Sequence, residues 1–287
     1  MITTKLVPNE IGPRIRLAMS GLSDKEQHVV RYCFALGSGL EGLSIHDLAE
    51  QQEVSAAMIV KLAQRLGFSG FREMKQAMVE YSHLPVTDLH NELNPNDDAP
   101  TVMAKVFNTA GHALQETLAI LDAAALMRAA EILRTARAID IIGAGGSGAM
   151  ALDAYHKFLR IGMRTAVITD SHLMVMSSSL LGPGSAVLGF SHSGKTLAVI
   201  QAFRLAQEQG AHTILITNTS NSPLSKHSDV VLSSVAEGSP ITGENAAARV
   251  AQLCIFDTLF VLVAQSAYTQ SLHNLDKTIE AVVDLRA

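Results

Sequence analysis

Hydrophobic positions along the 287-residue chain follow two different periods, one in each half. In the first half, the segment 23–36 places Val29 and Val30 on one helical face, and the stretches around Leu48 and Ile59 repeat this spacing of three to four residues. Such spacing is typical of amphipathic helices that bury one face against each other. The first half is therefore predicted to be a small all-helical domain.

In the second half, short runs rich in Val and Ile alternate with stretches long enough for a helix. Strand, helix and strand in this order indicate parallel strands joined by right-handed crossovers, with both faces of the sheet covered. We therefore expect an α/β domain with a doubly wound five-stranded parallel sheet in the order 2-1-3-4-5. The predicted strands are 138–143, 165–169, 185–190, 213–217 and 229–234, and the predicted helices are 101–121, 125–136, 147–161, 171–181 and 196–209.

A polar segment separates the two halves. Residues 81–100 contain Pro85, Pro95 and Pro100 together with three asparagines and four acidic residues. This composition interrupts helices and strands alike. We predict a first domain at 1–82, a linker at 83–100 and a second domain at 101–287.

Composition restricts the kind of partner. Lys and Arg number 22 and Asp and Glu number 27, which gives a net charge of −5, so any contact with DNA must come from a local patch. Cys33 and Cys254 lie far apart in apolar surroundings, which indicates neither a disulfide framework nor a cysteine metal site. The N-terminal residues lack an apolar run of signal-peptide length, and Asp257 interrupts the most hydrophobic run, 254–264. We expect a soluble cytoplasmic protein with no membrane partner, no metal and no cofactor.

The segment 44–62 has the pattern of two helices joined by a tight turn. Ser44 with Asp47 three residues later fits a capping box, and Ser55 fits the N-cap of the second helix. This arrangement exposes the first turn of the second helix, which helix-turn-helix proteins insert into the major groove of DNA. The alternative is an ordinary three-helix bundle with a solvated basic face. The predicted DNA-binding residues are Ser55, Ala56, Ala57, Lys61, Arg65, Arg72 and Lys75.

One copy of this basic patch is small for a DNA-binding surface. Roughly six to ten phosphate contacts, each adding about 0.9 to the salt slope, would require two copies of it. We therefore expect a homodimer or tetramer on an inverted-repeat operator.

Two loops rich in glycine and serine each follow a predicted strand and precede a predicted helix. The first, 143–148, has the G-x-G-x-x-G spacing of dinucleotide-binding loops, and the second, 189–196, matches the P-loop pattern G-x-x-x-x-G-K-T. A nucleoside triphosphatase is disfavoured because Gly189 falls inside the predicted strand and the next strand runs into Asn218, not into an aspartate that could hold magnesium.

In the predicted strand order, the two loops flank the point where the order reverses, which is where crevice ligands bind. Hydroxyls and backbone amides of both loops, from Ser147, Ser191, Ser193 and Thr196, would then surround one phosphate. A phosphorylated sugar fits this polarity. The alternative is that these residues only cap helices.

Five blocks of sequence resemble the RpiR-type transcriptional regulators: 54–78, 141–148, 156–162, 191–196 and 248–260. The resemblance implies a helix-turn-helix domain followed by a sugar isomerase (SIS) domain that senses a phosphosugar and thereby changes the affinity for DNA. It implies a regulator of sugar-metabolism genes, most simply a repressor, and not an enzyme. The predicted effector-binding residues are Gly145, Gly146, Ser147, Ser191, Ser193, Gly194, Thr196 and Glu244.

The alternative function is a sugar-phosphate isomerase on the same fold. Isomerisation by proton transfer requires a general base, for which His172 and Glu244 are the candidates. A DNA-binding domain would be superfluous on such an enzyme, which favours the regulator. Three roles remain open for Arg249, near the start of the last long helix: a contact with the effector, a contact with an acidic residue of a dimer partner, or an ordinary surface ion pair.

Overall fold

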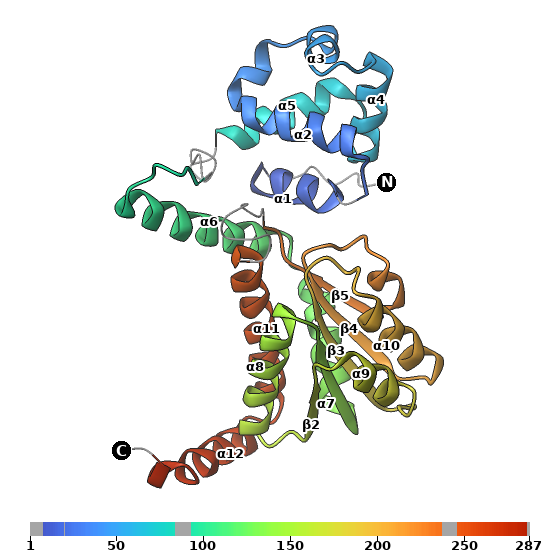
Figure 1. Ribbon diagram of the computed structural model, residues 1–287, viewed down its shortest axis with the longest axis vertical. Coiled ribbons are helices and arrows are strands. Elements are labelled where there is room, and N and C mark those ends of the chain that lie inside the picture. Colours follow the sequence, from blue (N-terminus) through green and yellow to red (C-terminus); the bar gives the residue numbers. More distant parts are fainter. Residues whose placement is uncertain (1–7, 20, 84–92, 237–245, 286–287) are drawn as a thin grey trace. The chain divides into compact units, whose positions relative to one another are not determined.

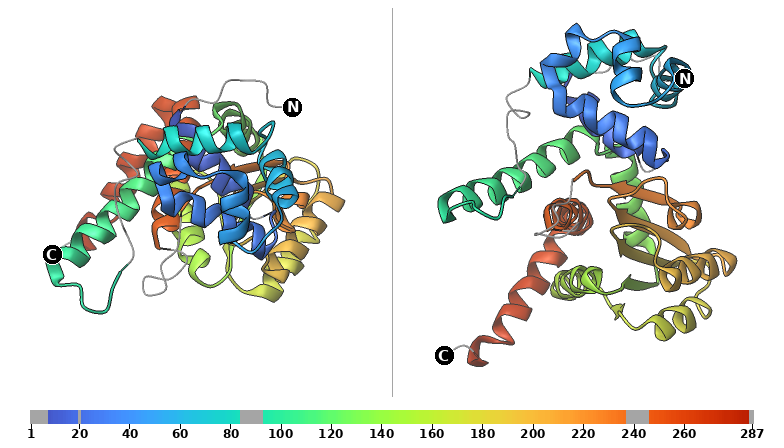
Figure 2. Two further views of the ribbon diagram at one scale, coloured as in Figure 1. Left: turned by 90° about the horizontal axis from the view of Figure 1, so that it is seen from above. Right: turned by 45° about the horizontal axis from the view of Figure 1, so that its top comes forward.

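The computed structural model describes residues 8–19, 21–83, 93–236 and 246–285 (Figures 1 and 2). The chain divides into two compact units, Met1–Ile120 and Leu121–Ala287. The first is helical and the second is built on a parallel sheet, as the two sequence periods predict.

Amphipathic helices form the first unit around one apolar core. Val29, Leu48, Ile59 and Leu62 are fully buried there, which confirms the helical faces predicted from their spacing. The elements are α1 (Pro8–Met19), α2 (Asp24–Leu36), the short 3-10 helix η1 (Gly37–Gly42), α3 (Ile45–Gln51), α4 (Ala56–Arg65), α5 (Phe71–Ser82) and α6 (Ala99–Ile120).

The turn between α3 and α4 has the predicted caps. The Ser44 and Asp47 side chains each accept a hydrogen bond from the other's backbone N–H, at 3.2 and 2.8 Å, and form a capping box. The Ser55 hydroxyl accepts the Met58 N–H at 3.2 Å at the start of α4. The chain turns between the helices at Glu53, which has a positive φ of 50°. The helix-turn-helix predicted from local sequence is therefore present.

Helix α6 packs in the first unit, whereas the sequence pattern assigned it to the second domain. On α6, Glu116 is only 4% exposed and forms an ion pair with Arg16 of α1. The Tyr81 hydroxyl of α5 also donates a hydrogen bond to this carboxylate. A buried carboxylate requires such partners. The two compact units accordingly meet between residues 120 and 121.

The second unit contains an all-parallel sheet in the predicted order β2-β1-β3-β4-β5. Helices α7, α8 and α11 cover one face of the sheet and helices α9 and α10 cover the other (Figure 1). The elements are α7 (Ala123–Thr135), β1 (Ala138–Gly143), α8 (Gly146–Arg160), β2 (Thr165–Ile168), α9 (Ser171–Ser178), β3 (Ser185–Ser191), α10 (Leu197–Glu208), β4 (His212–Thr217), η2 (Leu224–His227), β5 (Val230–Ser233), α11 (Ala246–Ser266), α12 (Tyr268–Glu280) and η3 (Val283–Leu285).

Among the described helices, only α11 is long and apolar enough to cross a membrane. Its residues Ile255, Phe256 and Leu259 are buried in the core of the second unit. There the Phe256 and Phe158 rings pack edge to face, with their centroids 5.4 Å apart. Packing of this kind is that of a core helix.

Candidate functional site

The two glycine- and serine-rich loops meet at one edge of the sheet. They follow β1 and β3, which are neighbours with Gly143 opposite Phe190. Between them lies a polar pocket of about 180 Å³, which we call the hydroxyl pocket. Its lining residues are Ala144, Gly146, Ser147, Phe190, Ser191, His192, Ser193 and Thr196.

The loop after β1 places the N-terminus of α8 at this pocket. Gly145 is the N-cap of α8 with φ 56°, a conformation that side chains rarely adopt, and Gly146 is the first residue of the helix. The first N–H groups of a helix have no partner within the helix and attract anions. Gly146, at the first turn of the helix, and Ser147, with its hydroxyl, line one side of the hydroxyl pocket, while the Ser147 N–H donates to the Ala144 carbonyl at 3.1 Å.

The loop after β3 is fixed by its own hydroxyls. The buried Ser191 Oγ accepts the Gly194 N–H at 3.2 Å, and the Ser193 Oγ accepts the Lys195 N–H at 3.3 Å. Gly194 has φ 62°, and a Cβ added there would lie 2.1 Å from the Ser222 Oγ. The loop therefore has a defined shape, and the serine O–H groups can still donate to a ligand.

The residues of the second loop that match the P-loop pattern have other roles in the structure. Gly189 lies within β3, where an added Cβ would meet the Phe203 ring at 2.5 Å, so glycine serves helix packing at this position. Lys195 is exposed and does not line the hydroxyl pocket. After β4 the Asn218 side chain donates to the Ala236 carbonyl at 3.1 Å. These contacts do not form the lysine and magnesium site of a triphosphatase.

His172, one of the two candidate bases, lies elsewhere. It lines a larger hollow of about 320 Å³ between α9 and α10, together with Val175, Met176 and Ala198. This hollow is lined largely by helix side chains and lacks the amides and hydroxyls of the two loops, so the smaller hydroxyl pocket fits an anion better. The other candidate base, Glu244, lies outside the described residues. Within those residues, no group of three or more His, Cys, Asp or Glu side chains could hold a metal ion.

Two residues near the hydroxyl pocket had weak or no sequence signal. His192 lines it from between the two serines of the second loop. Arg249, in the first turn of α11, lies against the first loop, because a Cβ on Gly146 would be 2.7 Å from its Nη2. Residues so far apart in sequence cannot be paired from spacing alone.

The start of α4 presents an exposed surface on the first unit. Ala57, Lys61 and Gln64 are exposed at intervals of four and three residues, and therefore lie on one face of the helix, beside the exposed N-cap Ser55. Ala56 is half-buried. We call this surface the α4 face. Gln64 was not among the residues predicted from sequence.

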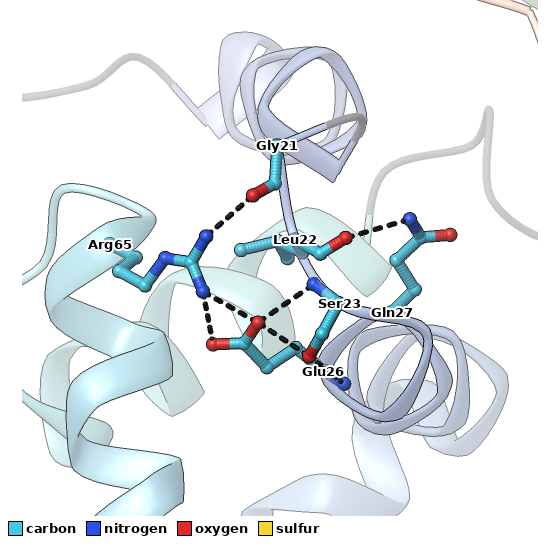
Figure 3. Close-up of polar contacts among 6 residues, drawn as sticks. All are labelled: Gly21, Leu22, Ser23, Glu26, Gln27 and Arg65. Carbon is cyan, nitrogen blue, oxygen red and sulfur yellow. Dashed lines mark hydrogen bonds and ion pairs between the residues drawn. The ribbon is translucent and has the colours of Figure 1, made fainter.

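Arg65 makes an intramolecular ion pair (Figure 3). Its Nη1 lies 2.6 Å from each carboxylate oxygen of Glu26, and its Nη2 donates to the Gly21 carbonyl. Burial by itself raises the pKa of Glu26, but hydrogen bonds from Ser23 and Arg65 outweigh it and hold this pKa below its ordinary value. The guanidinium therefore ties the end of α4 to the start of α2.

Lys75 is also held within the first unit, whereas Arg72 is exposed. The Lys75 Nζ donates to the Glu41 and Leu43 carbonyls, both at 3.0 Å, and lies 5.9 Å from the centre of the Phe71 ring. Arg72 lies in the first turn of α5. Of the four predicted basic residues, Arg65 and Lys75 thus contact other parts of the unit, whereas Lys61 and Arg72 form no hydrogen bond or ion pair with the described residues.

Each unit of the chain contains a segment that matches a known protein family. Residues 10–83 match the family "Helix-turn-helix domain, rpiR family", and residues 132–272 match the SIS domain. The chain is 40% identical over 280 residues to the HTH-type transcriptional regulator RpiR of Escherichia coli K12, which covers 97% of this chain and 94% of the relative. The chain belongs to the RpiR family of transcriptional regulators. The family membership expected from the sequence blocks is confirmed.

Two solved structures have the same fold. The Vibrio vulnificus NanR protein complexed with ManNAc-6P is 28% identical with a TM-score of 0.62, over 96% of this chain and 98% of that one. The sugar isomerase domain of the RpiR transcription factor from Sphaerobacter thermophilus has a TM-score of 0.58 at 23% identity and covers 62% of this chain and 98% of that one. The protein is therefore a DNA-binding transcriptional regulator and not an enzyme, and the isomerase alternative is not favoured.

Proposed function

We propose that this RpiR-family regulator acts in the cytoplasm, binds an inverted-repeat operator as a homodimer and changes its affinity for DNA when a phosphosugar occupies the hydroxyl pocket. The observation that carries the proposal is the convergence of the two loops, after β1 and β3, on that one pocket in a chain with a helix-turn-helix. The Vibrio vulnificus NanR protein was solved as a complex with the sugar phosphate ManNAc-6P, which supports the same chemistry here.

The chemistry of the hydroxyl pocket suits a phosphosugar. The N-terminus of α8 supplies backbone amides and partial positive charge for the phosphate. Ser147, Ser193 and Thr196 are hydroxyl donors and acceptors that can bind both phosphate and sugar hydroxyls. We propose the effector set predicted from sequence, with Gly145 and Gly194 shaping the loops. Glu244 belongs to this proposed set from outside the described residues.

For DNA we propose that the α4 face enters the major groove. Lys61 and Arg72 contact phosphates, and Ser55, Ala56 and Ala57 lie against the bases, where alanine methyls can pack on thymine. Gln64 extends this surface by one turn. Arg65 and Lys75 act by holding α4 and α5 in place, as their contacts with Glu26 and with two backbone carbonyls support.

We propose that the exposed apolar face of α6 binds a second copy of the chain. Both charged side chains of this helix are paired within the first unit, Glu116 with Arg16 and Lys105 with Asp97 at 2.7 Å. The exposed side chains Val102, Met103, Val106 and Phe107 follow one helical face, and Met103 and Phe107 are 64% and 76% exposed. An uncharged apolar face lacks the positive charge that DNA phosphates attract, but it can pack against the same face of a second copy across a two-fold axis. An inverted repeat requires that symmetry.

A binding experiment tests the proposal. DNA selected by the protein from a random library would be titrated with protein in the presence of ribose 5-phosphate, allose 6-phosphate or N-acetylmannosamine 6-phosphate. We expect an inverted repeat in the selected DNA and at least a fivefold change in its apparent Kd with one of these sugar phosphates, but not with the unphosphorylated sugar. Selected DNA without symmetry, or a Kd that no sugar phosphate changes, would contradict the proposal.

A further inference from the structure

The guanidinium of Arg249 lies directly over the loop after β1. A Cβ added to Gly146 would lie 2.7 Å from the Arg249 Nη2 and 3.6 Å from its Cζ. Arg249 belongs to α11 and Gly146 to α8, so two helices distant in sequence meet at the rim of the hydroxyl pocket. The space that the missing side chain of Gly146 would fill is occupied by the arginine.

Arg249 has no ion-pair partner in the part of the chain that the structure describes. Its side chain is exposed, and among residues 8–19, 21–83, 93–236 and 246–285 it forms neither a hydrogen bond nor an ion pair. Of the other arginines described in the second unit, Arg128, Arg134, Arg137 and Arg204 each contact a carboxylate or a carbonyl, whereas Arg160 and Arg164 form no hydrogen bond or ion pair with the described residues. What distinguishes Arg249 is that its guanidinium lies against Gly146, a residue that lines the hydroxyl pocket.

The hydroxyl pocket itself has no arginine or lysine in its lining. A phosphate monoester carries a charge of about −1.5 to −2 at neutral pH. The N-terminus of a helix offers only about half a positive charge. A guanidinium beside Gly146 adds a full positive charge and a planar fork of donors that matches phosphate oxygens.

We propose that Arg249 is the cationic ligand of the effector phosphate, and that Gly146 is a glycine because any side chain there would displace the guanidinium. The inference rests on the proposed function, since it assigns a residue to the same pocket. It resolves the three alternatives that the sequence left for Arg249 in favour of the effector contact. A guanidinium at this position also favours phosphorylated over neutral sugars, because its charge attracts only the anionic phosphate.

Isothermal titration of the full-length protein tests this assignment with ribose 5-phosphate, allose 6-phosphate, N-acetylmannosamine 6-phosphate and inorganic phosphate as probes. We expect Arg249→Ala to raise the Kd of the sugar phosphate that binds the wild type at least tenfold, and Arg249→Lys to raise it by a smaller factor because the charge remains but the fork is lost. Arg204→Ala, which removes an exposed arginine of α10 that is paired with Glu208, is the matched control and should change this Kd less than twofold.

Gly146→Ala supplies an independent arm. The added Cβ meets only the flexible end of the Arg249 side chain, so the variant should fold, which a thermal melt verifies. We expect it to weaken sugar-phosphate binding about threefold or more in the wild-type background and to have no further effect in the Arg249→Ala background. Equal losses in both backgrounds would show that Gly146 does not act through Arg249.

The outcomes separate the two claims. If the wild type binds a sugar phosphate and Arg249→Ala binds it within twofold of the same Kd, the role of Arg249 is refuted while the proposed function stands. If the wild type binds none of the four probes, the proposed function fails and the role of Arg249 fails with it.

Discussion

The Arg65 guanidinium lies 2.6 Å from both carboxylate oxygens of Glu26 and joins the end of α4 to the start of α2. Glu26 is 8% exposed, and it also accepts hydrogen bonds from the backbone and hydroxyl of Ser23 at 2.8 and 2.7 Å. The pair therefore fixes the orientation of the helix that carries the α4 face. Arg65, one of the basic residues predicted to bind DNA, thus joins two helices of the unit.

Arg65→Ala should destabilise the first unit. Removing one partner leaves a largely buried carboxylate without its cation, which costs about 3–5 kcal/mol for a fully buried pair. Because the Arg65 side chain is 48% exposed, we expect about 1–2 kcal/mol, seen as a Tm lowered by several degrees. Arg31→Ala, which removes an exposed arginine of α2, is the control. An unchanged Tm together with weakened DNA binding would instead place Arg65 on the DNA.

The same pair predicts a pH dependence. In the folded protein the pKa of Glu26 lies below its ordinary value of 4.5, so the stabilisation is complete above pH 4.5 and is lost as the pH falls through the folded pKa. The Tm difference between the wild type and Glu26→Gln should therefore be largest near neutral pH and shrink below pH 4.5. Glu80→Gln, on the exposed side of α5, controls for the loss of one charge. Parallel Tm curves for the wild type and Glu26→Gln would contradict the assignment.

Lys61→Ala should affect DNA binding without affecting folding. Its side chain is exposed in the middle of the α4 face, and we propose one phosphate contact for it. Loss of one contact in each half-site should lower the slope of log K against log salt by about 0.9 per contact. The measurement is a titration of selected DNA at several salt concentrations, with Lys25→Ala on the exposed side of α2 as control. Identical slopes for Lys61→Ala and the wild type would remove Lys61 from the interface.

Phe107→Glu should disrupt the dimer. In a two-fold interface a single substitution appears on both copies of the apolar face, so it places two like charges close to each other. We expect light scattering to give the mass of a monomer and the affinity for a full inverted repeat to fall more than tenfold. Gln115→Glu adds the same charge at another exposed position of α6 and should leave the mass unchanged. A Phe107→Glu protein that keeps the wild-type mass would exclude this face.

Local sequence predicts the features that depend on neighbouring residues. The caps at Ser44 and Ser55 depend on hydrogen bonds three residues away, and the loops after β1 and β3 follow from the strand and helix alternation. Once the strand order is right, the meeting of Ser147 with Ser193 at one pocket follows from topology.

Contacts between distant segments explain what the sequence did not predict. The pair of Arg65 with Glu26 and the approach of Arg249 to Gly146 arise only when helices pack, and no spacing rule signals them. The placement of α6 in the first unit has the same cause, since it depends on the burial of Glu116.

The most direct test of the account is a pair of operator titrations, with and without the sugar phosphate that binds most tightly, on the wild type and on Ser193→Ala. Coupling of about 1–3 kcal/mol between two sites corresponds to a change in affinity of about 5–150-fold. We predict a shift of this size in the operator Kd of the wild type and a much smaller shift for Ser193→Ala. Superimposable wild-type curves at saturating sugar phosphate, or an undiminished shift in Ser193→Ala, would contradict it.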